Sequence, residues 1–368
     1  MIYLIDTIGT ETGMHLYDQS FVETLQAKGH SVTVLSNYDT PLHQALFPNF
    51  YRGGKVLKAL RFAWSLLVMF CFYLHHHGSE EVYVYQSFGL RTIDRLFIRV
   101  LCGCPSLYVI VHDIFEITGS GQDPRQAQKL QFYQQHIPAI ICHSHDTETD
   151  LRRLGYQGRL LYYPHFQYQF SKEINLARVA PEVNNALAPD RVNFLFFGQV
   201  RETKGILILQ QAIDLLAREH PEFADQGRII IAGMDKGRLI ADREQPAFVR
   251  TILRYMDDSE LNFLFSHRPY VLLPYTDIYQ SGVLEVVIYF QCPSILSDIP
   301  FFRRVLKEYP SFGRLYSPND AATLAQTLLR AVAQGQPPSF SADDVKRYSD
   351  AHDASHLSQF LTSHIATC

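Results

Sequence analysis

Residues 194–205 read FLFFGQVRETKG, and they indicate most directly how this chain folds. The apolar run Phe194–Phe197 has the length and composition of a buried strand, and Gly198 ends it. A short polar loop then leads through Gly205 into the helical pattern Ile206–Arg218. A buried strand, a glycine turn and a helix in this order are typical of a parallel α/β sheet, in which ligands bind beside the carboxyl ends of the strands.

The same alternation of strand and helix patterns runs along the chain in two sets. The strand candidates are Tyr3–Ile5, Ser31–Leu35, Glu81–Tyr85, Leu107–Val111 and Ala139–Cys142 in the first set, and Phe194–Phe197, Arg228–Ala232, Tyr270–Pro274 and Pro293–Ser297 in the second. A stretch with three prolines, between Pro164 and Asp190, separates the sets and predicts a linker.

We therefore predict an α/β protein with two facing Rossmann-like domains, residues 1–165 and residues 166–345. A last amphipathic pattern near 342–365 predicts one terminal helix. We expect the terminal segment, residues 346–368, to pack back toward the N-terminal domain. Two such domains create a cleft at the carboxyl ends of both sheets.

Composition and charge exclude several classes of protein. The chain has 368 residues, a formal net charge of −4 and 47% hydrophobic residues, so it buries large cores and is not mainly disordered. Without a concentrated basic face, nucleic acid is not expected as a partner. Six cysteines without a CxxC pair favour a reducing compartment. Met1–Asp6 lacks the basic start of a signal peptide, and no apolar run reaches the roughly 18 residues of a spanning helix. We expect a cytoplasmic protein.

Two glycine-containing turns lie where a phosphate binds in α/β folds. Gly9 and Gly13 flank the first turn, which is either a plain structural turn or a ligand loop. This turn is not GxGxxG, and the second strand ends in Ser36-Asn37-Tyr38 with no acidic residue about 20 positions on, which disfavours a nicotinamide dehydrogenase. In the second turn, Arg201 and Lys204 suit a diphosphate, since Arg gives a forked contact and Lys a point charge. The alternative is a solvated loop.

Taken together, several motifs resemble one family. They are Gly198 with Lys204-Gly205, Leu272–Tyr275, Ser281–Glu285 and Pro293 with Ser297–Pro300 in the second half, and Lys28–Val32, Val111–Asp113 and Ser144–Leu151 in the first. In this order they resemble the retaining glycosyltransferases of the family 4 type (glycosyl transferases group 1), which have the glycosyltransferase B fold. The likeness covers most of the chain.

The resemblance implies a role for each matching residue. Asp277 would contact the donor sugar, Glu285 the ribose, and the backbone amides of Ser281, Gly282 and Val283 the distal phosphate. Lys204 and Arg201 would stabilise the departing diphosphate, and His112 would lie next to the transferred sugar. Gly9, Gly13, Gly198 and Tyr275 complete the expected donor site, with no metal and no cofactor beyond a UDP- or GDP-linked sugar. Asp277 replaces the family's usual Glu, and Gln199 stands where Arg is frequent.

A basic, apolar segment lies within residues 52–101. Lys55, Lys58 and Arg61 precede the apolar run Phe62–Leu74, and the stretch 90–101 repeats the mixture. Two interpretations stay open for this segment. Either it makes a peripheral membrane contact, with its basic residues toward anionic headgroups, or both helices pack on the first sheet.

The resemblance thus implies a hexosyltransferase that transfers a sugar to a hydroxyl of a glycan or lipid-linked glycan, in cell-surface or exopolysaccharide biosynthesis, at the cytoplasmic face of the membrane. Two alternatives stay open. One is a nucleotide-sugar epimerase of the same fold, which would release an altered nucleotide sugar without an acceptor. The other is a catalytically degenerate binding or scaffold subunit, for which Asp277 and Gln199 are the supporting departures.

Overall fold

The computed structural model describes residues 1–8, 14–39, 43–78, 80–101, 103–113, 126–168, 170, 174–278, 280–335 and 337–363, with the backbone alone at 113, 126 and 127. The chain divides into two compact units. Unit 1 contains Met1–Tyr168 and Ala351–Cys368, and unit 2 contains Gln169–Asp350. The division after Tyr168 falls inside the predicted linker.

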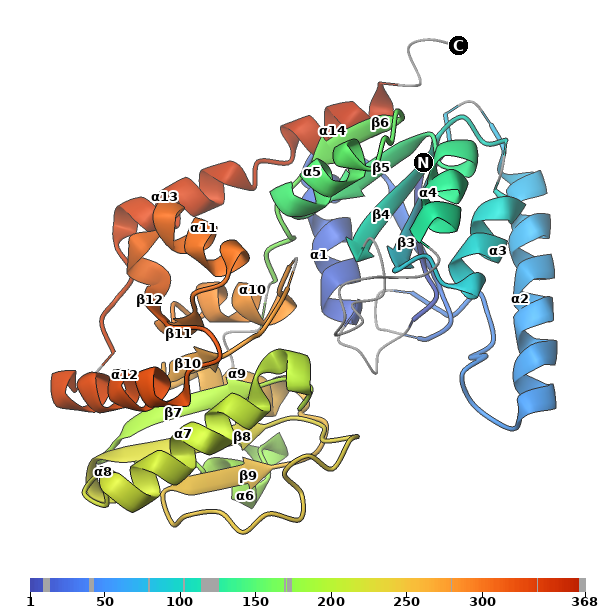
Figure 1. The fold of residues 1–368 in the computed structure, drawn as a ribbon. Helices are drawn as coiled ribbons and strands as arrows, with labels where there is room; N and C mark the ends of the chain where they lie inside the picture. The colour runs from blue at the N-terminus through green and yellow to red at the C-terminus, as the bar shows by residue number, and fades with distance from the viewer. Residues whose placement is uncertain are drawn as a thin grey trace. The chain divides into compact units, whose positions relative to one another are not determined.

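Unit 1 is built on a six-stranded parallel sheet with the order β2-β1-β3-β4-β5-β6 (Figure 1). Its strands are β1 (Ile2–Asp6), β2 (Val32–Ser36), β3 (Val82–Phe88), β4 (Leu107–Asp113), β5 (Ala139–Cys142) and β6 (Arg159–Tyr162). Its helices are α1 (Met14–Gln26), α2 (Lys55–His75), α3 (Thr92–Val100), α4 (Gln126–His136), α5 (His145–Arg153) and α14 (Ser355–Thr362). Helices α2, α3 and α4 lie on one side of the sheet and α1, α5 and α14 on the other.

Unit 2 repeats this plan with a sheet of order β12-β11-β10-β7-β8-β9, again parallel. Its strands are β7 (Val192–Phe197), β8 (Gly227–Ala232), β9 (Val249–Ile252), β10 (Tyr270–Leu273), β11 (Ser294–Ser297) and β12 (Gly313–Tyr316). Its helices are α6 (Pro181–Asn184), α7 (Ile206–Glu219), α8 (Phe223–Gln226), α9 (Asp258–Ser266), α10 (Gly282–Tyr289), α11 (Pro300–Glu308), α12 (Ala321–Gln334) and α13 (Ala342–Ala351). Two parallel sheets covered by helices confirm the predicted α/β fold class.

The end of the chain differs from the expected single helix. Helix α13 ends at Ala351, and α14 starts at Ser355. Between them, Asp353 accepts hydrogen bonds from Lys28 Nζ (2.7 Å) and from the Ser355 amide (3.3 Å), so a side chain of unit 1 stabilises the turn that interrupts the helix. Helix α14 then packs on unit 1, where Tyr108 Oη donates to the Phe360 carbonyl at 2.8 Å.

Helix α2 is longer than the predicted apolar run. It extends over 21 residues and is long and apolar enough to cross a membrane, by length and composition only, so the expectation that no segment reaches this length is wrong. The helix begins at Lys55, about two turns before Phe62, and ends at His75. On one side its Ser65 and Met69 are buried, and Phe62 and Phe72 pack against the core of unit 1.

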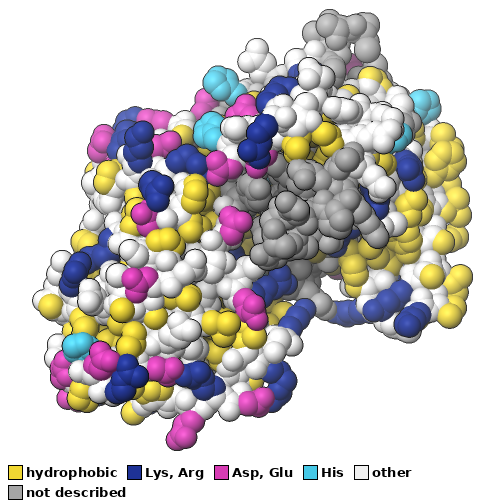
Figure 2. Space-filling view, in the orientation of Figure 1, with side chains coloured by type: hydrophobic (Ala, Val, Ile, Leu, Met, Phe, Trp, Pro, Cys, Tyr) yellow, Lys and Arg dark blue, Asp and Glu magenta, His cyan; other side chains and the backbone are white. Residues whose placement is uncertain are grey.

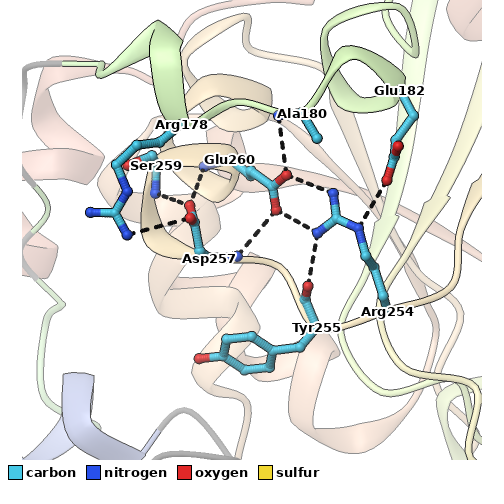
Figure 3. Close-up of polar contacts among 8 residues, drawn as sticks. All are labelled: Arg178, Ala180, Glu182, Arg254, Tyr255, Asp257, Ser259 and Glu260. Atoms are coloured by element: carbon cyan, nitrogen blue, oxygen red, sulfur yellow. Dashed lines mark hydrogen bonds and ion pairs between the residues drawn. The ribbon is translucent and has the colours of Figure 1, made fainter.

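A network of charged side chains holds the segment before β7 onto α9 (Figure 3). Arg254 makes a forked contact with Glu260 at 2.6 and 2.7 Å and also donates to Glu182 at 2.9 Å. Glu260 accepts further hydrogen bonds from the backbone amides of Ala180 and Asp257 at 3.3 Å. Because the Glu260 carboxylate is buried, these donors replace the water it loses. The network therefore stabilises the entry of the chain into unit 2.

Replacing Glu260 by Gln should lower the free energy of unfolding of unit 2 by about 2 kcal/mol at pH 7, since the amide cannot hold the Arg254 fork. The hydrogen bond from Arg254 lowers the pKa of Glu260 below its usual 4.5. A lowered carboxyl pKa stabilises the fold above the usual value, and this contribution is lost as the pH falls below it.

Urea unfolding at pH 7 and pH 4 checks this prediction, with the exposed Glu244→Gln as the control. The difference between Glu260→Gln and the wild type should shrink at pH 4, and an equal difference at both values would contradict the ionic role of Glu260.

Candidate donor site in unit 2 and buried histidines in unit 1

The carboxyl ends of β7, β8 and β10 meet through two glycines, Gly205 and Gly233, at which an added Cβ would clash with the backbone. A Cβ on Gly205, which has φ +71°, would lie 1.7 Å from the Pro274 carbonyl oxygen. A Cβ on Gly233, which has φ +139°, would lie 1.7 Å from the Gly198 carbonyl oxygen. These contacts bring the loops that follow the three strands into direct backbone contact.

Lys204 is positioned by this loop contact. Its Nζ lies 3.8 Å from the centre of the Tyr275 ring, and next to it the Thr276 amide donates to the Thr203 carbonyl at 3.1 Å. Tyr275 is 1% exposed and packs against Phe302. The predicted donor-loop tyrosine is therefore the platform beneath the lysine, and a cation over an aromatic face is held electrostatically without losing its charge.

Arg201 lies exposed at the start of the 3-10 turn Glu202–Lys204. It borders a pocket of about 220 Å³, whose lining also includes Gln199, Met234 and Lys236. Lys236 is a further cation at this edge that the sequence reasoning missed. The signal was present, because Ala232-Gly233-Met234-Asp235-Lys236 repeats the pattern of a strand, a glycine and a polar loop seen after β7.

The amino terminus of α10 lies at the same edge of the sheet. Ser281 caps the helix, because its Oγ accepts a hydrogen bond from the Leu284 amide at 3.2 Å. Val283 Cγ2 would be 3.4 Å from a Cβ on Gly198, which places the first turn of α10 beside the loop after β7. The amides of Ser281, Gly282 and Val283 thus lie near a helix end that favours anions. Asp277 is exposed in the preceding loop.

Glu285 lies on the first turn of α10 and is buried, with 6% of its surface exposed. Tyr348 of α13 donates a hydrogen bond to Glu285 Oε2 at 2.6 Å. Burial raises the pKa of Glu285 to about 8, while the hydrogen bond from Tyr348 acts in the opposite direction. Tyr348 is the second residue of this site that the sequence reasoning missed, since it comes 63 residues after its partner.

His112 lies at the carboxyl end of β4 in unit 1, 3% exposed. Its ring stacks on Phe88 with 4.3 Å between centroids, and Tyr17 packs edge-on against it at 4.9 Å. Burial, followed by the nearby His143 and His165, lowers the pKa of His112 well below its usual 6.5, so the ring is neutral at pH 7.

A chain of hydrogen bonds determines which nitrogen of His112 carries the proton. Gln86 Nε2 donates to Asp18 Oδ1 at 2.5 Å, and Tyr38 Oη donates to the other oxygen of Asp18. The Gln86 carbonyl oxygen must then face His112 Nε2, which lies 3.1 Å away. A neutral imidazole in this contact carries its proton on Nε2 and its lone pair on Nδ1.

Ser144 caps helix α5 directly after β5, because its side chain accepts hydrogen bonds from the amides of Asp146 and Thr147. His143 is buried and accepts a hydrogen bond from Tyr17 Oη at 2.7 Å through Nε2, while its Nδ1 donates to the Tyr163 carbonyl at 2.8 Å.

The expected site residues thus fall into two groups. Arg201, Lys204, Asp277, Ser281 and Glu285 belong to loops and helix starts at the carboxyl edge of the unit 2 sheet. His112 occupies the equivalent edge of the unit 1 sheet. Gly9 and Gly13 lie outside the described residues. Among the described residues, no group of three or more His, Cys, Asp and Glu side chains is arranged to hold a metal ion.

Comparison with known proteins identifies this architecture. No protein-family model matches the sequence, and no curated protein matches it. Solved structures do match in fold. Sucrose-phosphate synthase from Thermosynechococcus elongatus is 14% identical with a TM-score of 0.67, over 98% of this chain and 97% of that one. The Anabaena protein HepE in complex with UDP-glucose is 14% identical with a TM-score of 0.64, over 100% and 99%.

A third match is trehalose-6-phosphate synthase, studied with bisubstrate glycomimetics for glycosyltransfer with retention, at 12% identity and a TM-score of 0.62, over 100% and 99%. The chain has the glycosyltransferase B fold of these proteins, which confirms the predicted fold. Assignment to family 4 in particular stays a prediction.

The buried histidines predict acid sensitivity of unit 1. Burial lowers the pKa of His143 to about 4 and that of His165 to about 3, from a usual 6.5. The unfolded chain therefore binds protons that the folded chain excludes, and stability falls as the pH drops from 6.5 toward 4. We expect a loss of about 2 to 3 kcal/mol for each histidine by pH 4.5.

Urea unfolding between pH 7 and pH 4.5 measures this loss. His165→Leu should flatten the dependence on pH, and the exposed His145→Gln should leave it unchanged. An unfolding free energy that is constant over this interval would refute the neutral, buried state of these rings.

Proposed function

We propose that the chain is a retaining glycosyltransferase that moves a hexose from a UDP- or GDP-linked sugar to a hydroxyl of a glycan or lipid-linked glycan. The observation that carries the proposal is the convergence of Lys204, Arg201 and the amino terminus of α10 at one sheet edge, with Glu285 one turn away. Two cations and the amino terminus of a helix suit the binding of a diphosphate. The Glu285 carboxylate, one helical turn further on, suits the binding of a ribose diol. The named neighbours, one of which binds UDP-glucose, support the same donor class.

In this proposal the bond between the sugar C1 and the diphosphate oxygen breaks, and the acceptor oxygen forms its bond to C1 on the same face. The acceptor proton passes to the departing diphosphate oxygen, so atoms and charge balance without a protein nucleophile. Lys204, Arg201 and the amides of α10 stabilise the negative charge that develops on the diphosphate. Asp277 accepts hydrogen bonds from sugar hydroxyls, and His112 orients the sugar. The proposed enzyme needs no cofactor, because these cations supply the positive charge.

The proposed setting is the synthesis of cell-surface polysaccharide or exopolysaccharide at the cytoplasmic face of the membrane. Residues 52–101 support a peripheral contact there, because α2 is apolar, and basic residues cluster at its start. An enzyme held at this surface meets a lipid-linked acceptor in the plane of the bilayer.

A panel of UDP-, GDP- and TDP-sugars, with release of the nucleotide as the measurement, tests this function. The wild type should release nucleotide from one of the three donor types. Lys204→Ala should lower kcat about 100-fold, because the Lys204 cation stabilises negative charge that develops in the transition state. Lys307→Ala, a change of an exposed lysine on α11, is the matched control and should have no effect.

Analysis of the products separates the alternatives. An altered nucleotide sugar formed without an acceptor indicates an epimerase, and binding of nucleotide without turnover indicates a scaffold subunit. Wild-type activity in the Lys204→Ala variant would show that the donor site is assigned wrongly.

A further inference from the structure

The outer face of α2 exposes a row of large apolar side chains. Leu57, Leu60, Trp64, Leu67, Phe70 and Leu74 are each between 44% and 64% exposed. Their spacing of three and four residues puts them on one side of the helix. Figure 2 shows hydrophobic side chains gathered over α2, with Lys and Arg side chains near one end of this area.

The opposite face of α2 is occupied by unit 1 itself. Phe62 packs against Phe50 with 5.5 Å between centroids, and Phe72 packs against Tyr3 at 5.1 Å. Ser65 and Met69 are fully buried between these contacts. Since the core of unit 1 holds this face between Phe62 and Tyr73, α2 is attached to unit 1 over this part and presents its other face outward, while residues 55–60 are exposed. This arrangement suits a helix that lies on a surface and not one that crosses a bilayer.

The charges on α2 favour an anionic partner. The segment Lys55–His75 contains no acidic residue. Lys55 and Lys58 are exposed at its first turn, whereas Arg61 donates to the carbonyls of Asn49 and Arg52 at 3.2 and 3.0 Å. An apolar face about 26 Å long beside exposed lysines matches the acyl and headgroup layers of an anionic membrane.

We infer that the outer face of α2, and not α3, docks the protein on an anionic lipid bilayer. This narrows the proposed contact through residues 52–101 to one helix face. The apolar side chains Phe97 and Ile98 of α3 are completely buried. Its Arg91 pairs with Asp94 at 3.2 Å, and Arg99 lies over the Phe132 ring at 5.4 Å. The contacts of α3 are therefore made within unit 1.

A second copy of the chain is the competing occupant of this face. Pairing two α2 faces in parallel would bring Lys55 and Lys58 of both copies together, and pairing them antiparallel would put these lysines beside His75. Because the helix carries no acidic residue, neither arrangement pairs opposite charges along the helix. Charge therefore favours the anionic lipid surface.

Trp64 is the single tryptophan of the chain and is 58% exposed on this face, so its fluorescence reports the contact directly. The full chain is mixed with vesicles of phosphatidylcholine alone or with about 30% phosphatidylglycerol at low salt. We expect a blue shift and quenching by brominated lipid on the anionic vesicles only, weakened by added salt. Leu60→Glu with Leu67→Glu should weaken binding at least about tenfold, and so should Lys55→Glu with Lys58→Glu.

The matched control is Leu207→Glu, the same change at a 42% exposed leucine of α7 in unit 2, and it should bind as the wild type does. Arg95→Glu in α3 should also bind normally. Unchanged Trp64 emission on anionic vesicles, or equal binding by the Leu60→Glu and Leu67→Glu variant, would overturn the inference. A blue shift that depends on protein concentration without lipid, together with a dimer in sedimentation, would assign the face to a second copy. None of these measurements needs enzymatic activity, so they stand apart from the proposed reaction.

A second inference rests on a different observation, the contact between α13 and α10. Tyr348 is 8% exposed, and its ring packs edge-on against Tyr309 at 5.2 Å and Phe312 at 5.5 Å. These contacts direct its hydroxyl at Glu285 Oε2. The structure assigns Tyr348 as a positioning residue that holds Glu285 for the nucleotide. This assignment rests on the proposed donor site.

The contact also links nucleotide binding to pH. The titratable groups that respond to the Glu285 charge are Tyr348 on α13 and Tyr309 just before Pro310. A ribose diol donates hydrogen bonds to the charged carboxylate, so binding favours loss of the Glu285 proton. Since the pKa of this carboxyl is about 8, UDP affinity should rise between pH 7 and pH 9. Tyr348→Phe removes a donor to the charged form and should move this rise to higher pH.

Calorimetric titration of UDP, with GDP as the second probe, tests this between pH 6.5 and 9.5, on both sides of the Glu285 pKa of about 8. Tyr348→Phe should weaken binding about tenfold at pH 7 and less at high pH. Tyr309→Phe, a neighbouring tyrosine of the same aromatic cluster, is the control and should leave the profile in place. If the affinity of Tyr348→Phe for UDP follows the wild-type pH profile, or falls equally at every pH, the positioning role of Tyr348 is overturned while the donor site stands. Failure of the wild type to bind either nucleotide overturns the proposed donor site and this inference with it.

Discussion

The donor edge of unit 2 depends on one steric constraint, the contact between the backbone at Gly205 and the carbonyl oxygen of Pro274. The space there is too small for a Cβ, and the positive φ of Gly205 is one that other residues rarely adopt. Because the two loops touch, Lys204 sits directly over Tyr275, and Thr276 hydrogen-bonds to Thr203. A cation therefore reaches the sheet edge already oriented. Its rotamer freedom is reduced before any ligand binds, which lowers the entropy cost of holding a diphosphate.

The glycine pair at Gly198 and Gly233 extends the same principle to β8. The strand ends approach until the Gly233 Cα lies against the Gly198 carbonyl, so the loop that carries Lys236 lies beside the loop that carries Arg201. Two neighbouring loops with three cations between them thus share one edge, while the chain as a whole is slightly acidic. The overall charge balance hides this local concentration, which is why composition alone could exclude nucleic acid but could not locate an anion site.

Most of the fold and part of the site could be predicted from the sequence. All nine predicted strands are present, because each contains an apolar run that the sheet buries. The missed strands β6, β9 and β12 all lie at sheet edges, and each has four residues with an Arg among them. An edge strand is covered on fewer sides, so its sequence needs no continuous apolar run. The predicted single terminal helix failed for a related reason, since the break at Asp353 depends on Lys28, a residue more than 300 positions away.

Local sequence patterns do not reveal contacts between distant residues, and this explains which site residues could be predicted. Lys204, Ser281 and Glu285 follow strands directly, so their place at the sheet edge follows from the parallel topology. Tyr348, Gln86 and Asp18 act through partners 63, 26 and 68 positions away, and no local spacing signals such contacts. Helix α2 shows the converse case. Its sequence is apolar on nearly every side, so periodicity could not separate a packed helix from an exposed one, and both interpretations were open. The structure shows that the side with Met69 completes the core of unit 1 and that the side with Trp64 is exposed. A membrane contact of the exposed side stays a proposal.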